Sequence, residues 1–176
     1  MTHGTPLGAV ARGLAAGMIG TGVMTTWQEL SMKLQGSGPE GGGGGQDESD
    51  TQQRQDPWEQ ASAPAKAGRK ILEGVFDVKI PPERIGLLTD AMHWGYGISW
   101  GALYGLIQET VGGPRLRNGL LFGAGVWAMS YMMLVPTGLY QPPWEYPPKQ
   151  LAMDVSYHFA YGAGLGGGYA LAESRS

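Results

Sequence analysis

One helix-length pattern occurs twice in this chain and constrains its fold more than any other feature. Residues 93–108 read HWGYGISWGALYGLIQ, and residues 158–173 read HFAYGAGLGGGYALAE. Both begin with His and then carry Tyr, Gly, Gly, Tyr and Leu at the same offsets. Small residues spaced four apart are typical of membrane helices that pack closely. We therefore interpret the two segments as equivalent transmembrane helices of a duplicated helical bundle.

The fold predicted is an all-α membrane protein with four transmembrane helices arranged as two related helical hairpins. Each of four weakly charged segments is about long enough to cross a hydrocarbon core of ~30 Å as a helix. A Pro-Trp-Glu sequence lies in the loop of each hairpin, at residues 57–59 and 143–145. Because each hairpin crosses the membrane twice, the two share one orientation, unlike inverted repeats. The expected spans are residues 7–27, 87–107, 119–135 and 151–171.

The chain divides into four parts. Residues 1–34 form the first transmembrane helix and its extension, and residues 85–176 hold the second to fourth. Residues 35–57 are rich in Gly, Gln, Asp and Ser, cannot bury apolar surface, and are expected to be a disordered linker. Residues 58–84 hold a short amphipathic helix, roughly 61–76, either on the membrane surface or packed on the bundle ends.

Composition excludes several classes of partner and of chemistry. The chain has no cysteine, which excludes disulfides and thiolate ligands, and its net charge of −3 comes without a basic stripe. We therefore expect no nucleic-acid partner. The expected partners are the lipid bilayer and, through the glycine-rich helix faces, further copies or a larger membrane complex. Arginines beside the short loops place both termini in the cytoplasm; they are Arg12, Arg115, Arg117 and Arg175.

The candidate site consists of ionisable side chains inside the spans, where such residues are costly and usually functional. Each repeated helix carries an aspartate about one turn before its histidine. A glutamate ends the first span on the same membrane side, and a tyrosine lies about one turn deeper in each repeated helix. The predicted polar, proton-linked site is lined by Glu29, Asp90, His93, Tyr96, Asp154, His158 and Tyr161.

Several interpretations of this site remain open. The aspartates could simply bond to the histidines or cap helices and so fix the register of packing. The cluster could instead bind or relay protons, because histidine titrates near neutral pH. His93 and His158 could also ligate a haem, or join Glu29 around a divalent metal, although no cofactor is the primary expectation. No serine lies in a nucleophile-elbow or triad-like setting, so we expect no enzyme.

The second half of the chain resembles the YagU-like family of bacterial inner-membrane proteins. The similarity is carried by the opening Gly119-Leu120-Leu121, the exit 135–139 (VPTGL), the Pro142-Pro143-Trp144 loop, and the span with His158. This resemblance implies a multi-pass protein of the inner membrane with four spans and a long first loop facing the periplasm. The family's activity is undefined, and the role in acid resistance attached to it would suit a histidine–carboxylate site.

Overall fold

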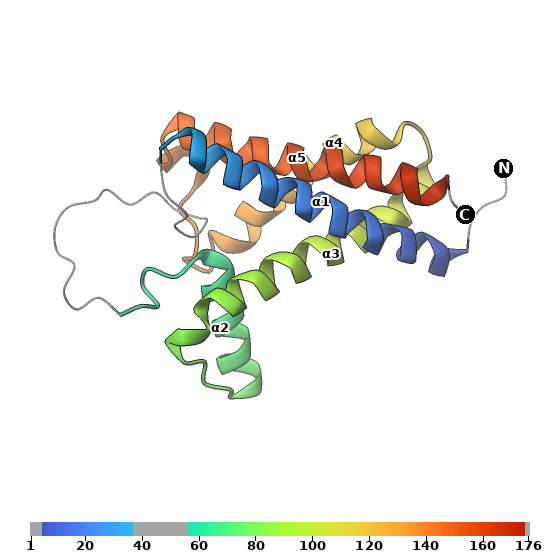
Figure 1. The fold of residues 1–176 in the computed structure, drawn as a ribbon. Helices are drawn as coiled ribbons and strands as arrows, with labels where there is room; N and C mark the ends of the chain where they lie inside the picture. Colours follow the sequence, from blue (N-terminus) through green and yellow to red (C-terminus); the bar gives the residue numbers. More distant parts are fainter. Residues whose placement is uncertain (1–4, 37–55, 175–176) are drawn as a thin grey trace.

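The computed structural model describes residues 5–36 and 56–174, and this part of the chain is all-helical, as predicted (Figure 1). Most of the predicted linker, residues 37–55, lies outside the described residues. The long helices are α1 (Pro6–Leu34), α3 (Ile85–Val111), α4 (Arg115–Leu134) and α5 (Pro148–Glu173). The shorter elements are α2 (Ala63–Phe76) and the 3-10 turns η1 (Pro82–Arg84) and η2 (Pro143–Glu145).

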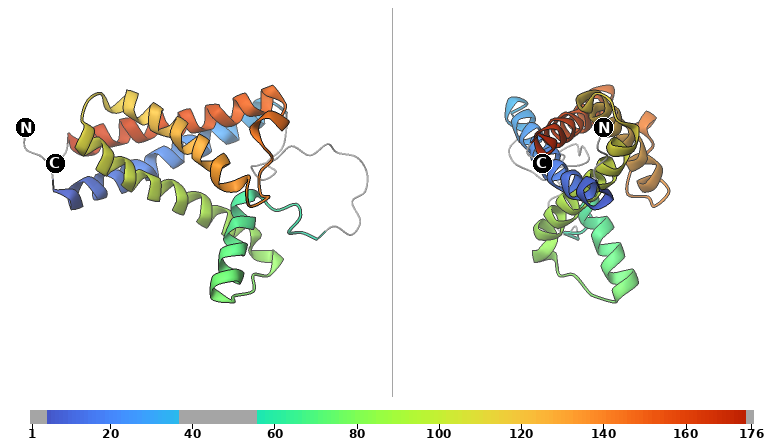
Figure 2. Two further views of the ribbon diagram at one scale, coloured as in Figure 1. Left: turned by 180° about the vertical axis from the view of Figure 1, so that it is seen from behind. Right: turned by 90° about the vertical axis from the view of Figure 1, so that its right-hand side faces the viewer.

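The four long helices lie side by side and alternate in direction (Figures 1 and 2). α1 packs against both α3 and α5, and α5 packs against α4 on its other side. α3 and α4 touch much less than the other neighbours and separate toward the end that carries α2. α2 runs across the direction of the long helices and packs on the beginning of α3. The start of α1 and the end of α5 lie at the opposite end.

Local sequence explains where the helices begin and turn. The Thr5 hydroxyl accepts a hydrogen bond from the Gly8 main-chain N–H at the start of α1, and Pro6 follows it. Ser62 caps α2 in the same way, so α2 begins at Ala63 rather than near residue 61. Gly112 and Gly113 have φ of +69° and +83°, a conformation that favours glycine. The resulting tight connection makes α3 and α4 antiparallel.

Glycines bring the helix backbones together in two separate contacts, one between α1 and α3 and one between α4 and α5. A Cβ atom added at Gly101 would lie 2.5 Å from the Gly13 carbonyl oxygen and 2.5 Å from the Gly17 Cα atom. In the second contact, a Cβ at Gly162 would collide with the Gly119 backbone. The glycine faces predicted for the repeated helices are therefore packing surfaces, and their partners lie within this chain.

The buried core is small, and large apolar side chains lie outside it. The largest fully buried side chains are those of Tyr104, Tyr169, Leu165 and Thr21. Each of the four long helices exposes Leu, Ile, Val, Met or Phe side chains on its outer face, including Met18, Ile107, Met132 and Phe159. Of the helices that the structure describes, α1 alone is both long and apolar enough to cross a membrane by its own composition.

The two Pro-Trp-Glu segments differ in structure although they match in sequence. Trp58 is 6% exposed and packs with Ala61 and Ala65 beneath the guanidinium of Arg69, whose Cζ lies 4.6 Å from its ring centroid. Trp144 is 81% exposed in η2. The loop of the first hairpin thus forms a small core of its own around α2, and the loop of the second does not.

Candidate functional site

His93 lies in α3 and faces α1. Its Nε2 atom is 3.3 Å from the hydroxyl oxygen of Thr25 in α1, and its side chain is half-buried. Asp90 lies one turn before His93 on α3. His158 lies at the same level on α5, because Tyr161, one turn after His158, bonds to Gly97, one turn after His93. The structure therefore brings together the two histidines that the repeated pattern predicts.

Asp154 and His158 form a second part of the site, one turn apart on α5. The Nδ1 atom of His158 is 2.9 Å from the Asp154 carbonyl oxygen and 3.7 Å from the carboxylate Oδ1. The other carboxylate oxygen, Oδ2, accepts hydrogen bonds from Trp127 Nε1 at 2.8 Å and from the Tyr131 hydroxyl at 3.0 Å. Both donors come from α4, so the Asp154 carboxylate joins α4 to α5 beside His158.

The two tyrosines of the predicted site have different surroundings. Tyr161 is buried, and its hydroxyl donates to the Gly97 carbonyl oxygen at 2.7 Å, which connects α5 to α3. Tyr96 is partly exposed and its ring packs edge-on against Trp100. Tyr161 thus lies within the bundle next to the histidines, while Tyr96 lies at its edge.

Glu29 and Asp90, by contrast, have exposed side chains. Within the described part of the chain, no hydrogen bond or ion pair joins Glu29 to the histidines. The same residues contain no group of three or more His, Cys, Asp or Glu side chains arranged to hold a metal ion. The candidate site is therefore centred on His93, Asp154 and His158, which we call the histidine cluster.

An apolar layer lies deeper in the bundle, beyond Tyr161. Leu165 and Ala16 are fully buried, and the rings of Tyr104 and Tyr169 meet edge-to-face with centroids 5.7 Å apart. These two tyrosines occupy equivalent positions in the repeated pattern. The hydroxyls of both tyrosines bond toward the far end of the bundle, to the Arg115 carbonyl oxygen and to Glu109, so Leu165, Ala16 and the two rings form the packed layer.

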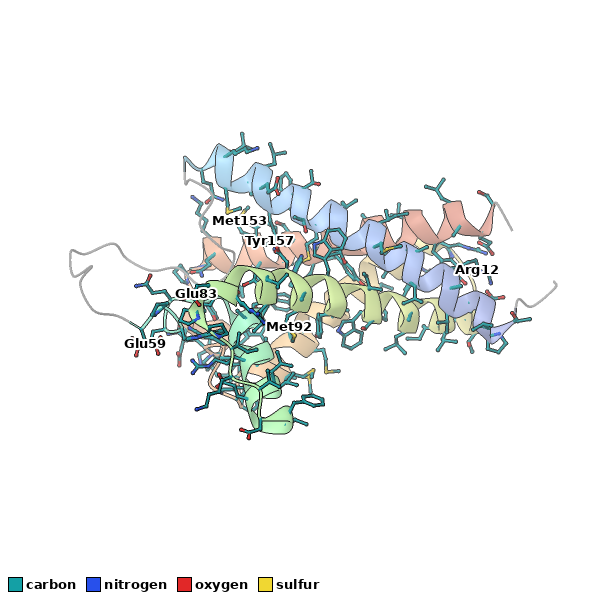
Figure 3. The ribbon with its side chains drawn as sticks, turned by 60° about the horizontal axis from the view of Figure 1, so that its bottom comes forward. Arg12, Glu59, Glu83, Met92, Met153 and Tyr157 are labelled. Atoms are coloured by element: carbon teal, nitrogen blue, oxygen red, sulfur yellow. The ribbon has the colours of Figure 1, made fainter. Side chains whose placement is uncertain are left out.

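A second polar cluster, which the sequence analysis did not predict, lies at the far end of the helices. The Arg12 Nη2 atom is 2.8 Å from Glu109 Oε2, and the Tyr169 hydroxyl donates to the same oxygen at 3.0 Å. Figure 3 shows Arg12 at this end, whereas Met92 and Glu83 lie at the α2 end. We call Arg12, Glu109 and Tyr169 the arginine cluster.

A similar ion pair joins the other two helices at this end. Arg115 donates to both carboxylate oxygens of Glu173, at 2.9 and 2.6 Å. Both ion pairs could have been predicted from the sequence, because each combines an arginine near the start of one helix with a glutamate at the end of its antiparallel neighbour.

No family model, curated protein or solved structure matches the chain.

Proposed function

We propose that this chain is a multi-pass membrane protein in which all four long helices cross the bilayer. The helices contain 29, 27, 20 and 26 residues, so each reaches the ~30 Å of a hydrocarbon core. Apolar side chains cover their outer faces and glycines join their inner faces, which is how membrane helices associate. α1 is long and apolar enough to cross a membrane by its own composition, and we propose that packing against α1 and α5 stabilises the other spans.

The duplication of a helical hairpin is part of this proposal. Two observations support it. Each pair of helices, α1 with α3 and α4 with α5, is closed by glycines of a four-residue spacing on both partners. Each pair also ends in an ion pair between arginine and glutamate, Arg12–Glu109 and Arg115–Glu173.

The function that the site supports best is a non-enzymatic response to acid. His93 and His158 lie on different helices, each about one turn from the Tyr161–Gly97 hydrogen bond that joins α5 to α3, and both are partly buried. Histidine charges between about pH 8 and 5. Protonation would place like charges on α3 and α5, and the resulting repulsion would favour separation of these helices at the α2 end. The juxtaposition of the two histidines is the observation that carries this proposal.

The bacterial inner membrane is the proposed location, and it rests on the resemblance to the YagU-like family. The role in acid resistance attached to that family is consistent with a site that responds to protons. The fully buried Leu165 and Ala16, which pack beyond Tyr161, favour a site that exchanges protons from one membrane face over a pathway through the bundle.

Tryptophan fluorescence of the full chain in nanodiscs, followed from pH 8 to 5, tests this function. Trp127 and Trp27 are suitable reporters, because Trp127 donates to Asp154 in the histidine cluster and Trp27 donates to Ser156, which lies between Asp154 and His158 on α5. We expect a reversible transition in the native chain that is lost in the double variant His93→Gln, His158→Gln. Ser99→Ala is the control, since Ser99 bonds only within its own helix at an exposed position. A transition that persists in the double variant would refute the proposal.

A structural or accessory role is the second candidate, and the bonding of Asp154 favours it. Its carboxylate already accepts two hydrogen bonds from α4, an arrangement that fixes packing without any change of protonation. This candidate predicts that Asp154→Asn lowers stability. It also predicts that the native chain, like the double histidine variant, shows no fluorescence transition between pH 8 and 5. If His93 and His158 instead hold a haem, the purified protein will show a Soret band, and this band will be absent from the double histidine variant.

A further inference from the structure

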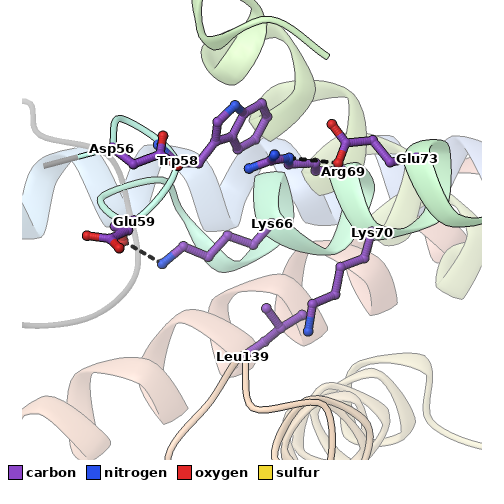
Figure 4. A pocket seen from close by; sticks show the side chains of 8 residues that line it. All are labelled: Asp56, Trp58, Glu59, Lys66, Arg69, Lys70, Glu73 and Leu139. Atoms are coloured by element: carbon purple, nitrogen blue, oxygen red, sulfur yellow. Dashed lines mark hydrogen bonds and ion pairs between the residues drawn. The ribbon is translucent and has the colours of Figure 1, made fainter. Parts of the chain in front are cut away.

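The short helix α2 has one apolar surface that the rest of the described chain leaves exposed. Ile71 and Val75 lie one turn apart on this helix, and their side chains are 47% and 72% exposed. By helical periodicity they project from a different side of α2 than its charged residues, which line a groove against the neighbouring loops (Figure 4). We call the side that carries Ile71 and Val75 the apolar side of α2.

The charged side of α2 is turned toward loops at the end of the bundle. Lys66 Nζ donates to the Glu59 carbonyl oxygen at 2.7 Å, and Lys70 Nζ donates to the Thr137 carbonyl oxygen at 2.9 Å. Glu59 precedes α2 and Thr137 follows α4, so both acceptors belong to connections rather than to the long helices. The lysines of α2 are therefore held at the ends of the proposed spans, where water is near.

α2 packs on a stripe of α3 that faces away from the bundle. A Cβ atom added at Gly68 would lie 2.7 Å from Met92 Cγ and 2.9 Å from Leu88 Cδ1, so these two side chains of α3 contact α2. Leu88 and Met92 are one turn apart, and helical periodicity continues their stripe through Leu103 and Leu106, which are exposed. In the four-span arrangement this stripe faces lipid, and α2 therefore lies on the lipid side of α3.

The contact with α3 also sets the depth of α2 in the proposed membrane. α3 contains 27 residues and is about 40 Å long, which is roughly 10 Å more than the thickness of a hydrocarbon core. With this excess shared between both ends, the hydrocarbon begins about 5 Å from the start of α3. Leu88 lies at this level, and Met92 lies about 6 Å deeper. Because α2 runs across α3 at these residues, it lies at the boundary between headgroups and acyl chains (Figure 1).

The order of contacts around α2 indicates which way its apolar side points. Ala65, Gly68 and Ile71 follow one another at three-residue intervals, so each side chain is rotated by about 60° from the one before. Ala65 belongs to a buried cluster that packs with Ile85, the first residue of α3, whereas Gly68 contacts Met92, two turns farther along. The same rotation continued to Ile71 leads deeper still, toward the centre of the bilayer.

The size of the apolar side favours lipid over a second copy of the chain. α2 contains 14 residues, and its apolar side presents Ile71 and Val75, with Phe76 at the end of the helix. A stable interface between proteins buries about 800 Å² on each partner, which is more than these side chains offer. An interfacial helix needs only an apolar side that enters the acyl region by about 5–10 Å and a charged side in water.

We propose that α2 is an interfacial membrane helix, with Ile71 and Val75 among the acyl chains of the nearer leaflet and with Lys66 and Lys70 in water. This inference rests on the proposed membrane location, but not on the acid response. An α2 inserted in this way anchors the start of α3, the helix that carries His93, at a fixed depth.

Electron paramagnetic resonance of spin-labelled single-cysteine variants of the full chain, in phosphatidylcholine liposomes, tests this inference. The chain has no cysteine, so a nitroxide on one introduced cysteine reports one position. Molecular oxygen concentrates in the bilayer and a neutral nickel chelate stays in water, so the ratio of their collision rates with the label measures depth. We expect labels at Ile71→Cys and Val75→Cys to collide more with oxygen. Labels at the matched controls Lys66→Cys and Lys70→Cys, on the same helix, should collide more with the nickel chelate.

A label at Leu103→Cys, in the exposed stripe of α3, separates failure of this inference from failure of the membrane proposal. If that label meets oxygen while those at Ile71 and Val75 meet the nickel chelate, the long helices lie in the membrane and the inference about α2 is wrong. If the label at Leu103 also meets the nickel chelate, the proposed membrane location is itself wrong. Labels at Ile71 and Val75 that are shielded from both reagents, with spin–spin broadening that unlabelled protein removes, would overturn the inference by identifying a second copy as the occupant.

Discussion

At the scale of single residues, glycine decides how closely the helices approach. Gly101 faces the backbone of α1, and Gly95, on the same helix, has open space where a Cβ would lie. We expect Gly101→Ala to destabilise the protein by about 1–3 kcal/mol, because backbone cannot move aside as a side chain can. Gly95→Ala should be neutral or slightly stabilising, since alanine favours helix. Thermal unfolding in mild detergent would measure both, and equal effects would contradict the close packing of α1 on α3.

Asp154 offers a second test at this scale. Its carboxylate binds Trp127 across the α4/α5 contact, and a hydrogen bond to a charged group contributes about 1.5–3 kcal/mol. Trp127→Phe should therefore lower stability by about 2 kcal/mol, whereas Trp144→Phe should have little effect because that ring is largely exposed. Both variants replace an indole ring by a phenyl ring, so a comparable loss of stability in both would argue against the hydrogen bond between Trp127 and Asp154.

At the scale of helices, the ion pairs at the far end should contribute unequally to stability. Glu109 is 22% exposed and binds both Arg12 and Tyr169, while Glu173 is 40% exposed in its pair with Arg115. Removing one member of a partly buried pair leaves its partner unpaired, so Glu109→Gln should cost about 2 kcal/mol. Glu173→Gln should cost no more than about 1 kcal/mol, as exposed pairs usually do. Unfolding of the two variants side by side would show whether this order holds.

At the scale of the whole molecule, four crossings predict which loops share a membrane face. The natural chain has no cysteine, so each single variant carries one label site. Lys79→Cys and Gln141→Cys should react with an impermeant maleimide from one face, and Arg117→Cys and Ser174→Cys from the other. Labelling of Gln141→Cys and Arg117→Cys from the same face would rule out a crossing by α4, and with it the two-hairpin topology.

Much of the architecture could be predicted from the sequence, because it depends on local pattern. The four long helices, the glycines spaced four apart and the amphipathic α2 all follow from composition and periodicity within a few turns. The equivalence of His93 and His158 was also visible in the repeat, and in the structure the turns that follow them are joined by the Tyr161–Gly97 hydrogen bond. Local pattern was insufficient for Glu29, whose exposed position depends on how α1 packs rather than on its own segment.

The sequence by itself determined which faces of the helices are small, which are apolar and where the chain turns. Only the tertiary structure decided which faces meet, and so which polar groups become partners. Arg12 and Glu109 are 97 positions apart and bond because α1 and α3 pack as antiparallel neighbours. Trp58 is buried and Trp144 exposed because only the first has Arg69 and α2 to cover it. Such pairings depend on contacts between distant segments, which the periodicity of one segment does not encode.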